Sequence, residues 1–474
     1  MAHRITGKEL KQLGYEQGRI LGLARELSEQ GLKIMTKQEL LALLKKVKTY
    51  PELFISDDLM KPLAEAMVLE MSIPPDPTIS LNATAGGYKA YGTEYIEEGA
   101  KVQMDIAMRL PITVGGALMP DAHQGYGLPI GGVLAIRNAI IPYGVGVDIG
   151  CRMALTIFDI PAAHFQENEA KYKRELIAHT KFGAGVAYKG RERADHEVLE
   201  SEVFSMTPFI NQLRDKAYSQ LGTSGGGNHF VEWGIIDFTG ADKALNIPEG
   251  SYLALLSHSG SRGLGATIAG HYTKLAKEIC KLPKEAVNLA WLDLSSQEGN
   301  EYWLAMNLAG DYASACHDVI HKKITQAVGG QVLAKVENHH NFAWKENWNG
   351  QEVLVHRKGA TPAAKGVLGI IPGSMTAPGF LVRGRGEVSS INSASHGAGR
   401  RMSRTKAMAA ITQADMKEIL RKHQVTLIGA GLDEAPMAYK DINQVMAAQS
   451  DLVDVVARFV PKIVRMANDG SRED

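Results

Sequence analysis

The sequence is poor in cysteine, balanced in charge and without a long apolar run. Three cysteines in 474 residues exclude a framework of disulfide bonds and indicate a reducing, cytoplasmic location. The 52 Lys and Arg residues equal the 52 Asp and Glu residues, so a polyanion would have to meet a local basic patch. Arg137 and Asn138 interrupt the most apolar stretch, residues 131–149, and the N-terminus lacks the apolar core of a signal peptide. We therefore expect no membrane association.

The common nucleotide-binding and zinc-binding motifs are also absent. The chain contains no G-x-x-x-x-G-K-[ST], no C-x-x-C and no H-E-x-x-H, which excludes a P-loop and the familiar zinc motifs. Residues 260–265 follow a predicted strand and precede a predicted helix but do not spell G-x-G-x-x-G. Cys316, His317 and His321 share one predicted helix and could bind zinc, although we favour a packed or solvent-exposed face of that helix.

Glycine is present in excess, at 49 residues, in a chain that is otherwise 45% hydrophobic and 22% charged. This ordinary globular composition excludes disorder and coiled coil, whereas the glycines indicate positive φ angles or close approach to a ligand. Residues 1–72 have apolar residues at helical spacing, with Thr36 and Glu39 forming a capping-box pair, and predict a helical module. Three prolines within residues 74–77 predict a linker over residues 73–89.

Residues 90–474 form the predicted catalytic domain. Short β-rich runs occur at 132–141, 230–236 and 252–256, between glycine-rich loops. The sequence shows neither a repeat of fixed period nor a regular alternation of strand and helix, which argues against a parallel barrel or a doubly wound sheet. The pattern predicts an α+β fold of packed β-sheets with surrounding helices, beside the small all-helical N-terminal module. The helices are expected near residues 94–109, 265–280, 297–325, 405–422 and 440–460.

Five metal-binding side-chain candidates lie in small, glycine-rich loops or at strand ends. Asp148 and Cys151 stand three residues apart in a tight turn, and His229 follows three glycines. His258 closes a predicted strand, and His340 belongs to a His-His-Asn sequence. Each residue alone is more simply explained as structural. Together, imidazole, thiolate and carboxylate suit manganese, cobalt or zinc better than magnesium or calcium, and they predict a mixed, binuclear site.

A further histidine has the surroundings of a nucleophile. His396 is flanked by Ser and Ala before it and by Gly-Ala-Gly after it, which leaves room for a bulky partner. The residues that follow are expected to begin a helix, whose free amides would favour a phosphate. Neutral imidazole is a nucleophile near pH 7, so a phosphorylated or nucleotidylated histidine is one hypothesis. A histidine that only satisfies a turn is an equal alternative.

A basic segment favours an anionic substrate. Between His356 and Lys406 the sequence has nine Lys or Arg residues and a single acid, Glu387. Interleaved glycine and serine let the backbone approach phosphates while arginine supplies paired contacts. A solvated surface is the ordinary explanation of such a run, but we favour phosphate binding.

These motifs, in this order, resemble the RtcB family of RNA ligases. The resemblance covers residues 90 to 445 and rests on 119–127, 129–132, 146–151, 227–230, 257–265, 339–341, 356–361, 372–375, 395–400 and 434–441. It implies a compact α+β fold and an enzyme of tRNA splicing or RNA repair that uses GTP and two Mn²⁺ ions. The implied substrates are an RNA 2′,3′-cyclic phosphate or 3′-phosphate end and an RNA 5′-hydroxyl end.

The resemblance also assigns roles to individual residues. It implies one manganese at Asp148, Cys151 and His229, and a second at Cys151, His258 and His340, with a bridging thiolate. It implies that His396 is guanylylated and that an RNA 3′-ppG intermediate follows. The nucleotide and its phosphates would meet Asn228, Glu232, Asn341, Ser374, Met375, Gly397, Ala398 and Gly399.

Two departures from the family pattern concern the guanine pocket. Gly379 stands where the family usually has a serine, and the chain does not end in the family's Lys-Gly. This leaves Lys462 and Arg465 as candidate substitutes for that lysine. The alternatives to ligation are a metal-dependent RNA-end phosphoesterase, a 3′-end guanylyltransferase that does not ligate, and an RNA-binding module with vestigial chemistry. Residues 5–18 faintly resemble a helical segment of tRNA nucleotidyltransferases, and a helical cap on the core is an equal alternative.

Overall fold

The computed structural model describes residues 5–15, 19–72 and 78–468. It divides the chain into two compact units, Met1–Pro77 and Thr78–Asp474. The predicted linker over residues 73–89 stays a prediction, because residues 73–77 lie outside the described ranges. Among the described residues, no helix combines the length and the apolar character that a membrane crossing needs.

The N-terminal unit is helical, as predicted. Thr36 caps a helix through its hydroxyl, which accepts from the Glu39 amide, while the Glu39 carboxylate accepts from the Thr36 amide. This reciprocal pair is the predicted capping box. The apolar faces pack on one another around Leu10, Leu40 and Leu44, which are fully buried. The α-helices are α1 Gly7–Gln12, α2 Arg19–Gly31, α3 Lys37–Thr49 and α4 Lys61–Ser72.

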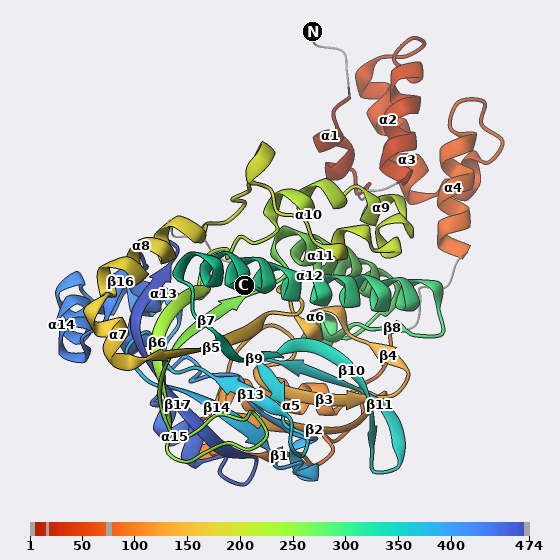
Figure 1. The fold of residues 1–474 in the computed structure, drawn as a ribbon. Helices are drawn as coiled ribbons and strands as arrows, with labels where there is room; N and C mark the ends of the chain where they lie inside the picture. The colour runs from red at the N-terminus through yellow and green to blue at the C-terminus, as the bar shows by residue number, and fades with distance from the viewer. Residues whose placement is uncertain (1–4, 16–18, 73–77, 469–474) are drawn as a thin grey trace. The chain divides into compact units, whose positions relative to one another are not determined.

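An eight-stranded sheet forms the centre of the second unit (Figure 1). One of its faces is covered by the helices α8 (Glu169–His179) and α12 (Gln297–Val328), which pack around Trp233. The sheet curls toward its other face, so that its two outermost strands meet. The Asn338 side chain on one of them is hydrogen-bonded to the Ile370 backbone on the other. The strand order is β13 (Leu368–Ile371), β14 (Gly379–Gly384), β17 (Val453–Met466), β6 (Phe230–Phe238), β7 (Gly250–Ser259), β5 (Arg152–Pro161) and β9 (Val332–His339), with β16 (Thr426–Ile428) paired to β17.

A five-stranded sheet adjoins the first one in sequence and in space. Residue 340 alone separates β9 from β10, so the chain passes from one sheet to the other at His340. The helix α5 (Glu98–Met108) packs on this sheet through Met104 and Ala107. A two-stranded ladder of β12 (Ala360–Pro362) and β15 (Ser393–Ser395) ends at His396. The five strands, in order, are β1 (Lys89–Ala90), β2 (Thr113–His123), β3 (Ile130–Ile136), β11 (Gln351–Lys358) and β10 (Asn341–Trp348).

The α+β class and most of the predicted elements are confirmed. The three β-rich runs overlap β3, β6 and β7, and the predicted helices at 94–109, 265–280 and 297–325 overlap α5, α11 (Arg262–Ile279) and α12. The run 405–422 is broken into α13 (Arg404–Ala410) and α14 (Gln413–His423), because Thr412 caps a new helix.

Two helix predictions are wrong. Residues 440–460 form only the short helix α15 (Ile442–Ala447), after which the chain enters the 14-residue strand β17. The β-branched residues of β17 pair with strands on both sides, and this tertiary pairing outweighs local helix propensity. No helix begins after His396, since Gly399 takes a φ of +71° and the next helix starts at Arg404.

Candidate functional site

Four strand ends bring the predicted metal ligands to one edge of the eight-stranded sheet. In the antiparallel ladders, Arg152 is level with Ser259 of β7 and with His339 of β9. The residue before β5 is therefore beside the end of β7 and the residue after β9. Phe230 pairs with His258, which adds the residue before β6 to the same edge. Strand register, rather than proximity in sequence, assembles this group.

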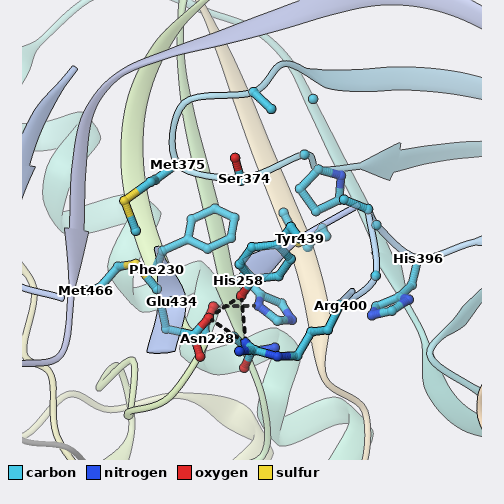
Figure 2. Close-up of a pocket in the computed structure, with 18 of the residues that line it drawn as sticks. Asn228, Phe230, His258, Ser374, Met375, His396, Arg400, Glu434, Tyr439 and Met466 are labelled. Carbon is cyan, nitrogen blue, oxygen red and sulfur yellow. Dashed lines mark hydrogen bonds and ion pairs between the residues drawn. The ribbon is translucent and has the colours of Figure 1, made fainter. Parts of the chain in front are cut away.

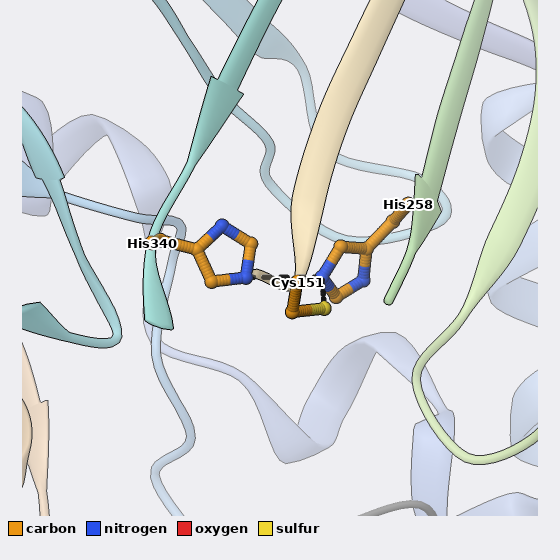
Figure 3. Close-up of side chains that lie close together, drawn as sticks. All are labelled: Cys151, His258 and His340. Atoms are coloured by element: carbon orange, nitrogen blue, oxygen red, sulfur yellow. Dashed lines mark hydrogen bonds between the residues drawn. The ribbon is translucent and has the colours of Figure 1, made fainter. Parts of the chain in front are cut away.

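Cys151 lies at the centre of the assembled side chains (Figure 3). Its Sγ is 3.1 Å from His258 Nε2 and 3.5 Å from His229 Nε2. His258 Nε2 is in turn 3.2 Å from His340 Nε2. Cys151, His258 and His340 are all buried and form one group of donor atoms with the spacing that a metal ion requires.

A second group shares the same sulfur. Asp148, Cys151 and His229 also converge, with His229 Nε2 3.1 Å from Asp148 Oδ2. Gly260 is required beside this group, because a methyl group there would come within 1.9 Å of Asp148 Oδ1. Both groups match the two ligand sets that the resemblance implies, residue for residue. Their role as metal ligands remains a prediction.

The hydrogen bonds behind the ligands fit a cation better than an empty polar cluster. The Nδ1 atoms of His229 and His258 are bonded to the carbonyl oxygens of Ser224 and Asn228, at 2.8 and 3.2 Å. A carbonyl oxygen can only accept a hydrogen bond, so Nδ1 of each ring carries a proton, and the neutral His258 ring turns its Nε2 lone pair toward Cys151. Burial lowers the pKa of His258 to about 3, and burial lowers the pKa of His340 well below its usual value. The His258 Nε2 lone pair, which lies 3.2 Å from His340 Nε2, can therefore serve as a metal ligand.

Asp148 is ionised despite its position. Burial alone would raise the pKa of its carboxyl group, but the hydrogen bond and charge of His229 and the bond from Cys151 outweigh burial and lower the pKa. The group therefore offers carboxylate, thiol and imidazole at one point. This mixture of hard and soft ligands is typical of sites for manganese, cobalt or zinc.

His396 lies beside the predicted metal ligands at the edge of the sheet, and a carboxylate orients its ring. Its ring centroid is 5.0 Å from that of His340. Asp121 Oδ2, on β2, accepts from the His396 amide at 3.1 Å and lies 2.7 Å from His396 Nδ1. Burial would raise the pKa of Asp121, but the hydrogen bond and charge of His396 outweigh it and lower the pKa. The Asp121 carboxylate thus holds the proton on Nδ1 and leaves Nε2 available as a nucleophile.

A pocket opens next to His396 (Figure 2). Asn228, Phe230 and His258 line one side, and Ser374 and Met375 line another. Seven of the eight residues predicted to meet the nucleotide line this pocket: Asn228, Glu232, Ser374, Met375, Gly397, Ala398 and Gly399. Apolar side chains on one wall suit a nucleotide base, and the His396 imidazole at the end suits a phosphate.

The eighth residue, Asn341, is engaged elsewhere. Its side-chain amide donates to the Asp148 carbonyl at 3.4 Å, and its Oδ1 accepts from the Gly359 amide at 2.8 Å. Asn341 therefore links the turn that contains Asp148 to Gly359, which lies beside His396. It is not among the residues that line the pocket. Its predicted contact with the nucleotide stays a prediction.

Glu232 reaches the pocket as a neutral acid. It is 4% exposed on β6, and burial raises the pKa of its carboxyl group well above the usual value. A protonated carboxyl donates one hydrogen bond and adds no negative charge. Such a group can face a nucleotide without repelling its phosphates.

A cluster of charged side chains lines the other side of the pocket. It was not predicted from the sequence. Arg400 stacks over the Tyr439 ring, with its guanidinium carbon 5.2 Å from the ring centroid. Glu434, which is 3% exposed, is hydrogen-bonded to Tyr439 and Arg404 and lies 3.5 Å from Arg400. The functional position of Asp121 was likewise missed, although both groups lie within the quoted motifs at 119–127 and 434–441.

The predicted basic strip does not form one open surface. Arg357 is fully buried and bidentate to Glu346, and Lys358 is 9% exposed. Arg383, Arg385 and Arg404 pair with carboxylates of other segments. The strip fails as a surface because the fold buries two of its residues on β11 and pairs others with carboxylates. Arg400 and Arg404 do line the pocket, which keeps part of the expected positive charge at the site.

Lys462 and Arg465, the candidate substitutes for the lysine at the end of the family's chains, do not line the pocket. Val464 and Met466 of β17 line it, so the intervening Arg465 points away. Its guanidinium instead donates to the Leu176 and Ile177 carbonyls at the end of α8. Lys462 is also absent from the pocket lining, whereas Gly379 belongs to it.

Cys316, His317 and His321 form the packed helix face that was favoured over a zinc site. All three are buried on α12. Ser257 Oγ is hydrogen-bonded to His317 Nδ1 at 2.6 Å and to His321 Nε2 at 2.7 Å. The histidines thus fasten α12 to β7, and the metal-type groups among the described residues do not include them.

Comparisons with known proteins point to one family. Residues 103–467 match the family described as tRNA-splicing ligase RtcB. The chain is 34% identical to the RNA-splicing ligase RtcB of Escherichia coli K12, over 76% of this chain and 92% of that protein. It is 29% identical to the tRNA-splicing ligase RtcB of Nanoarchaeum equitans, over 76% of this chain and 90% of that protein.

Proposed function

The chain belongs to the RtcB family of RNA ligases, and from this premise we propose that it joins RNA ends with GTP and Mn²⁺ through a guanylylated His396. The substrates are an RNA 3′-phosphate or 2′,3′-cyclic phosphate end and an RNA 5′-hydroxyl end. The observation that carries the proposal is the pairing of His396 with Asp121 beside the shared-sulfur ligand groups.

Two manganese ions are the proposed cofactor. Asp148, Cys151 and His229 would hold one, and Cys151, His258 and His340 the other. The oriented lone pairs and the ionised carboxylate support this assignment, because they supply the donors that such ions prefer. When bound, the ions supply positive charge that stabilises the negative charge growing on phosphate oxygens.

His396 is the proposed nucleophile of the first step. Its Nε2 attacks the α-phosphorus of GTP, an N–P bond forms, the bond to the bridging oxygen breaks, and pyrophosphate leaves. Asp121 keeps the Nδ1 proton in place and stabilises the positive charge that the ring gains. Arg400 and Arg404 add positive charge at the pocket for the triphosphate.

Two further transfers complete the proposed reaction. An oxygen of the RNA 3′-phosphate attacks the histidine-bound phosphorus, the N–P bond breaks, and an RNA 3′-ppG end results. The RNA 5′-hydroxyl then attacks the 3′-phosphorus, forms the new phosphodiester and releases GMP. A 2′,3′-cyclic phosphate is first opened by water to the 3′-phosphate.

Labelled GTP tests the nucleophile directly. Wild-type protein incubated with [α-³²P]GTP and Mn²⁺ is expected to form an acid-labile protein–GMP adduct, and His396→Ala is expected to form none. His423→Ala is the matched control, since His423 is exposed at the end of α14. Absence of the wild-type adduct, or its persistence in His396→Ala, contradicts the proposal. ATP in parallel tests the pocket that contains Gly379 and no C-terminal lysine.

Metal binding is tested apart from activity. Cys151→Ser is expected to lower Mn²⁺ binding at both sites, because one sulfur belongs to both ligand groups. Cys280→Ser, which changes a buried cysteine outside both groups, is expected to bind as wild type does. Equilibrium dialysis with metal analysis measures the stoichiometry. Loss of a single ion in Cys151→Ser would argue against a shared ligand.

The alternative functions differ from ligation at defined steps. A metal-dependent RNA-end phosphoesterase would bind the ions and form no GMP adduct. A 3′-end guanylyltransferase would form the adduct and the RNA 3′-ppG end and stop there. The oriented Nε2 of His396 favours nucleotidyl transfer over simple hydrolysis, and RNA products resolved on a gel distinguish ligation from capping of the 3′ end.

A further inference from the structure

An exposed tyrosine stands next to the site without a packing role. Tyr126 is 68% exposed, in the loop between β2 and β3. Its ring lies beside Tyr143, with ring centroids 6.3 Å apart and planes inclined by 36°. A large aromatic side chain left in water gains little for folding, and the tilted neighbouring ring extends the aromatic surface.

Two lysine side chains lie close to this aromatic pair. Lys358 Nζ donates to the Tyr126 and Tyr143 carbonyls at 2.6 and 3.2 Å, and it lies 5.0 Å from the Tyr143 ring centroid. Lys277 Nζ lies 5.5 Å from the same ring. The Lys358 side chain therefore links the backbones of the two aromatic residues.

A hollow continues from Tyr143 along α11. Its lining includes Val147, Thr273, Lys274 and Lys277. The Thr273 hydroxyl is buried and has no hydrogen-bond partner among the described residues, and Lys274 is exposed. The hollow thus offers a hydroxyl group and, in Lys274, an exposed ammonium group that lies 3.8 Å from the Glu278 carboxylate of the same lining.

The surface is connected to both halves of the active site. His123, three residues before Tyr126, lines the pocket of His396, and three residues span at most about 11 Å. Lys358 precedes Gly359, where a methyl group would come within 3.2 Å of His396 Cε1. On the other side, Val147 precedes the metal-ligand candidate Asp148.

We propose that Tyr126, Tyr143 and Lys274 form a platform that binds unpaired nucleotides next to the reacting RNA end. A base stacks on Tyr126, and the following phosphate meets Lys274. This proposal rests on the proposed function for the identity of the substrate. Aromatic rings accept any base, so the platform grips RNA without reading its sequence, as a ligase of varied ends requires.

Charge and chemistry favour RNA over a protein partner. Lysine beside an exposed aromatic ring is the arrangement that binds single-stranded nucleic acid. A separate pocket already accounts for the nucleotide that reacts with His396. The platform therefore serves the polymer.

Direct binding tests the platform without the chemical steps. The probe is a fluorescent single-stranded RNA with a 3′-phosphate, titrated with full-length protein and Mn²⁺ in the absence of GTP, with anisotropy as the signal. Tyr126→Ala is expected to raise Kd roughly 5- to 150-fold, the loss of one stacked base. Tyr126→Phe is expected to bind as wild type does, because stacking needs the ring and not the hydroxyl.

Controls separate this result from misfolding and from failure of the proposed function. Tyr218→Ala removes another solvent-exposed tyrosine, on α10 (Arg214–Gln220), and is expected to leave Kd unchanged. Adduct formation with GTP is expected to be the same in Tyr126→Ala and wild type. RNA binding that depends on Tyr126 supports the platform even if no GMP adduct forms.

Three outcomes overturn the platform. They are equal RNA affinity of Tyr126→Ala and wild type, equal weakening in Tyr126→Ala and Tyr126→Phe, and absence of RNA binding by wild type. Lys274→Gln adds an independent check, since removal of one phosphate contact lowers the slope of log Kd against log salt by about one. An unchanged slope excludes Lys274 from the platform.

Discussion

The Asp121 carboxylate acts on His396 through one ring nitrogen and one backbone amide. Asp121→Asn keeps the shape of the side chain and removes the charge that favours the Nδ1 proton and a positively charged ring. We expect adduct formation with GTP to slow roughly 10²- to 10⁴-fold. Rapid-quench measurement at saturating GTP and Mn²⁺ gives this rate.

Metal content distinguishes this positioning role from general damage to the site. Asp121→Asn is expected to keep the Mn²⁺ stoichiometry of wild type, because Asp121 belongs to neither ligand group. Asp105→Asn, an exposed substitution on α5, is expected to change neither the rate nor the metal content. A normal adduct rate in Asp121→Asn would leave His396 without a functional orienting group.

The sequence identified ligands more readily than orienting groups. Cys151, His229 and His258 stand out because glycine and serine surround them, and the structure brings them together. The sequence around Asp121 does not distinguish it from a surface acid. Its position beside His396 becomes visible only in the folded structure. Glu434 was missed for the same reason, since its importance comes from burial against two arginines.

At the scale of elements, a buried ion pair joins β10 to β11. Arg357 is fully buried, and its guanidinium contacts both oxygens of Glu346, at 2.5 and 3.1 Å. Glu346→Ala leaves this charge without its partner, so we expect a loss of about 3 kcal/mol in the free energy of unfolding. Urea unfolding followed by tryptophan fluorescence measures it.

A neighbouring carboxylate gives the matched comparison. Glu352→Ala removes an exposed glutamate from β11, directly across the hairpin from β10. Its effect is expected to stay within about 0.5 kcal/mol. If both substitutions had the same effect, the Arg357 pair would contribute no more than a surface contact.

Local sequence predicted helices well and the last strand poorly. Periodic segments such as α12 satisfy their own backbone hydrogen bonds, so apolar spacing was enough to find them. Residues 453–466 read equally well as a helix until β6 and β14 supply partners on both sides. Pro461, which cannot donate to a ladder, is accommodated at a bulge.

At the scale of the whole molecule, the predicted site residues all belong to one of the two compact units. The N-terminal unit has its own core around Leu10, Leu40 and Leu44. We expect a chain that lacks residues 1–77 to form the GMP adduct at the wild-type rate and to bind Mn²⁺ with the same stoichiometry. Adduct labelling and dialysis of the shortened protein measure both.

A defect confined to RNA joining would assign the N-terminal unit to the RNA substrate. Loss of the adduct itself would instead contradict the assignment of the whole first step to residues 78–474. The α+β class could be predicted from composition and from the lack of a regular alternation of strand and helix, but the curling of the sheet could not. The curling depends on strand pairings between residues far apart in the sequence, such as Met466 with Phe230. A local sequence pattern does not reveal such pairings.

The position of β17 has a consequence for synthesis of the protein. This strand lies between β14 and β6 yet is the last one made, so the central sheet stays in two pieces until residues 453–466 have left the ribosome. Proteins with such long-range pairing fold slowly and expose apolar strand faces meanwhile. A nascent chain of this ligase is therefore an expected client of chaperones, and it acquires its active site only after β17 has been made.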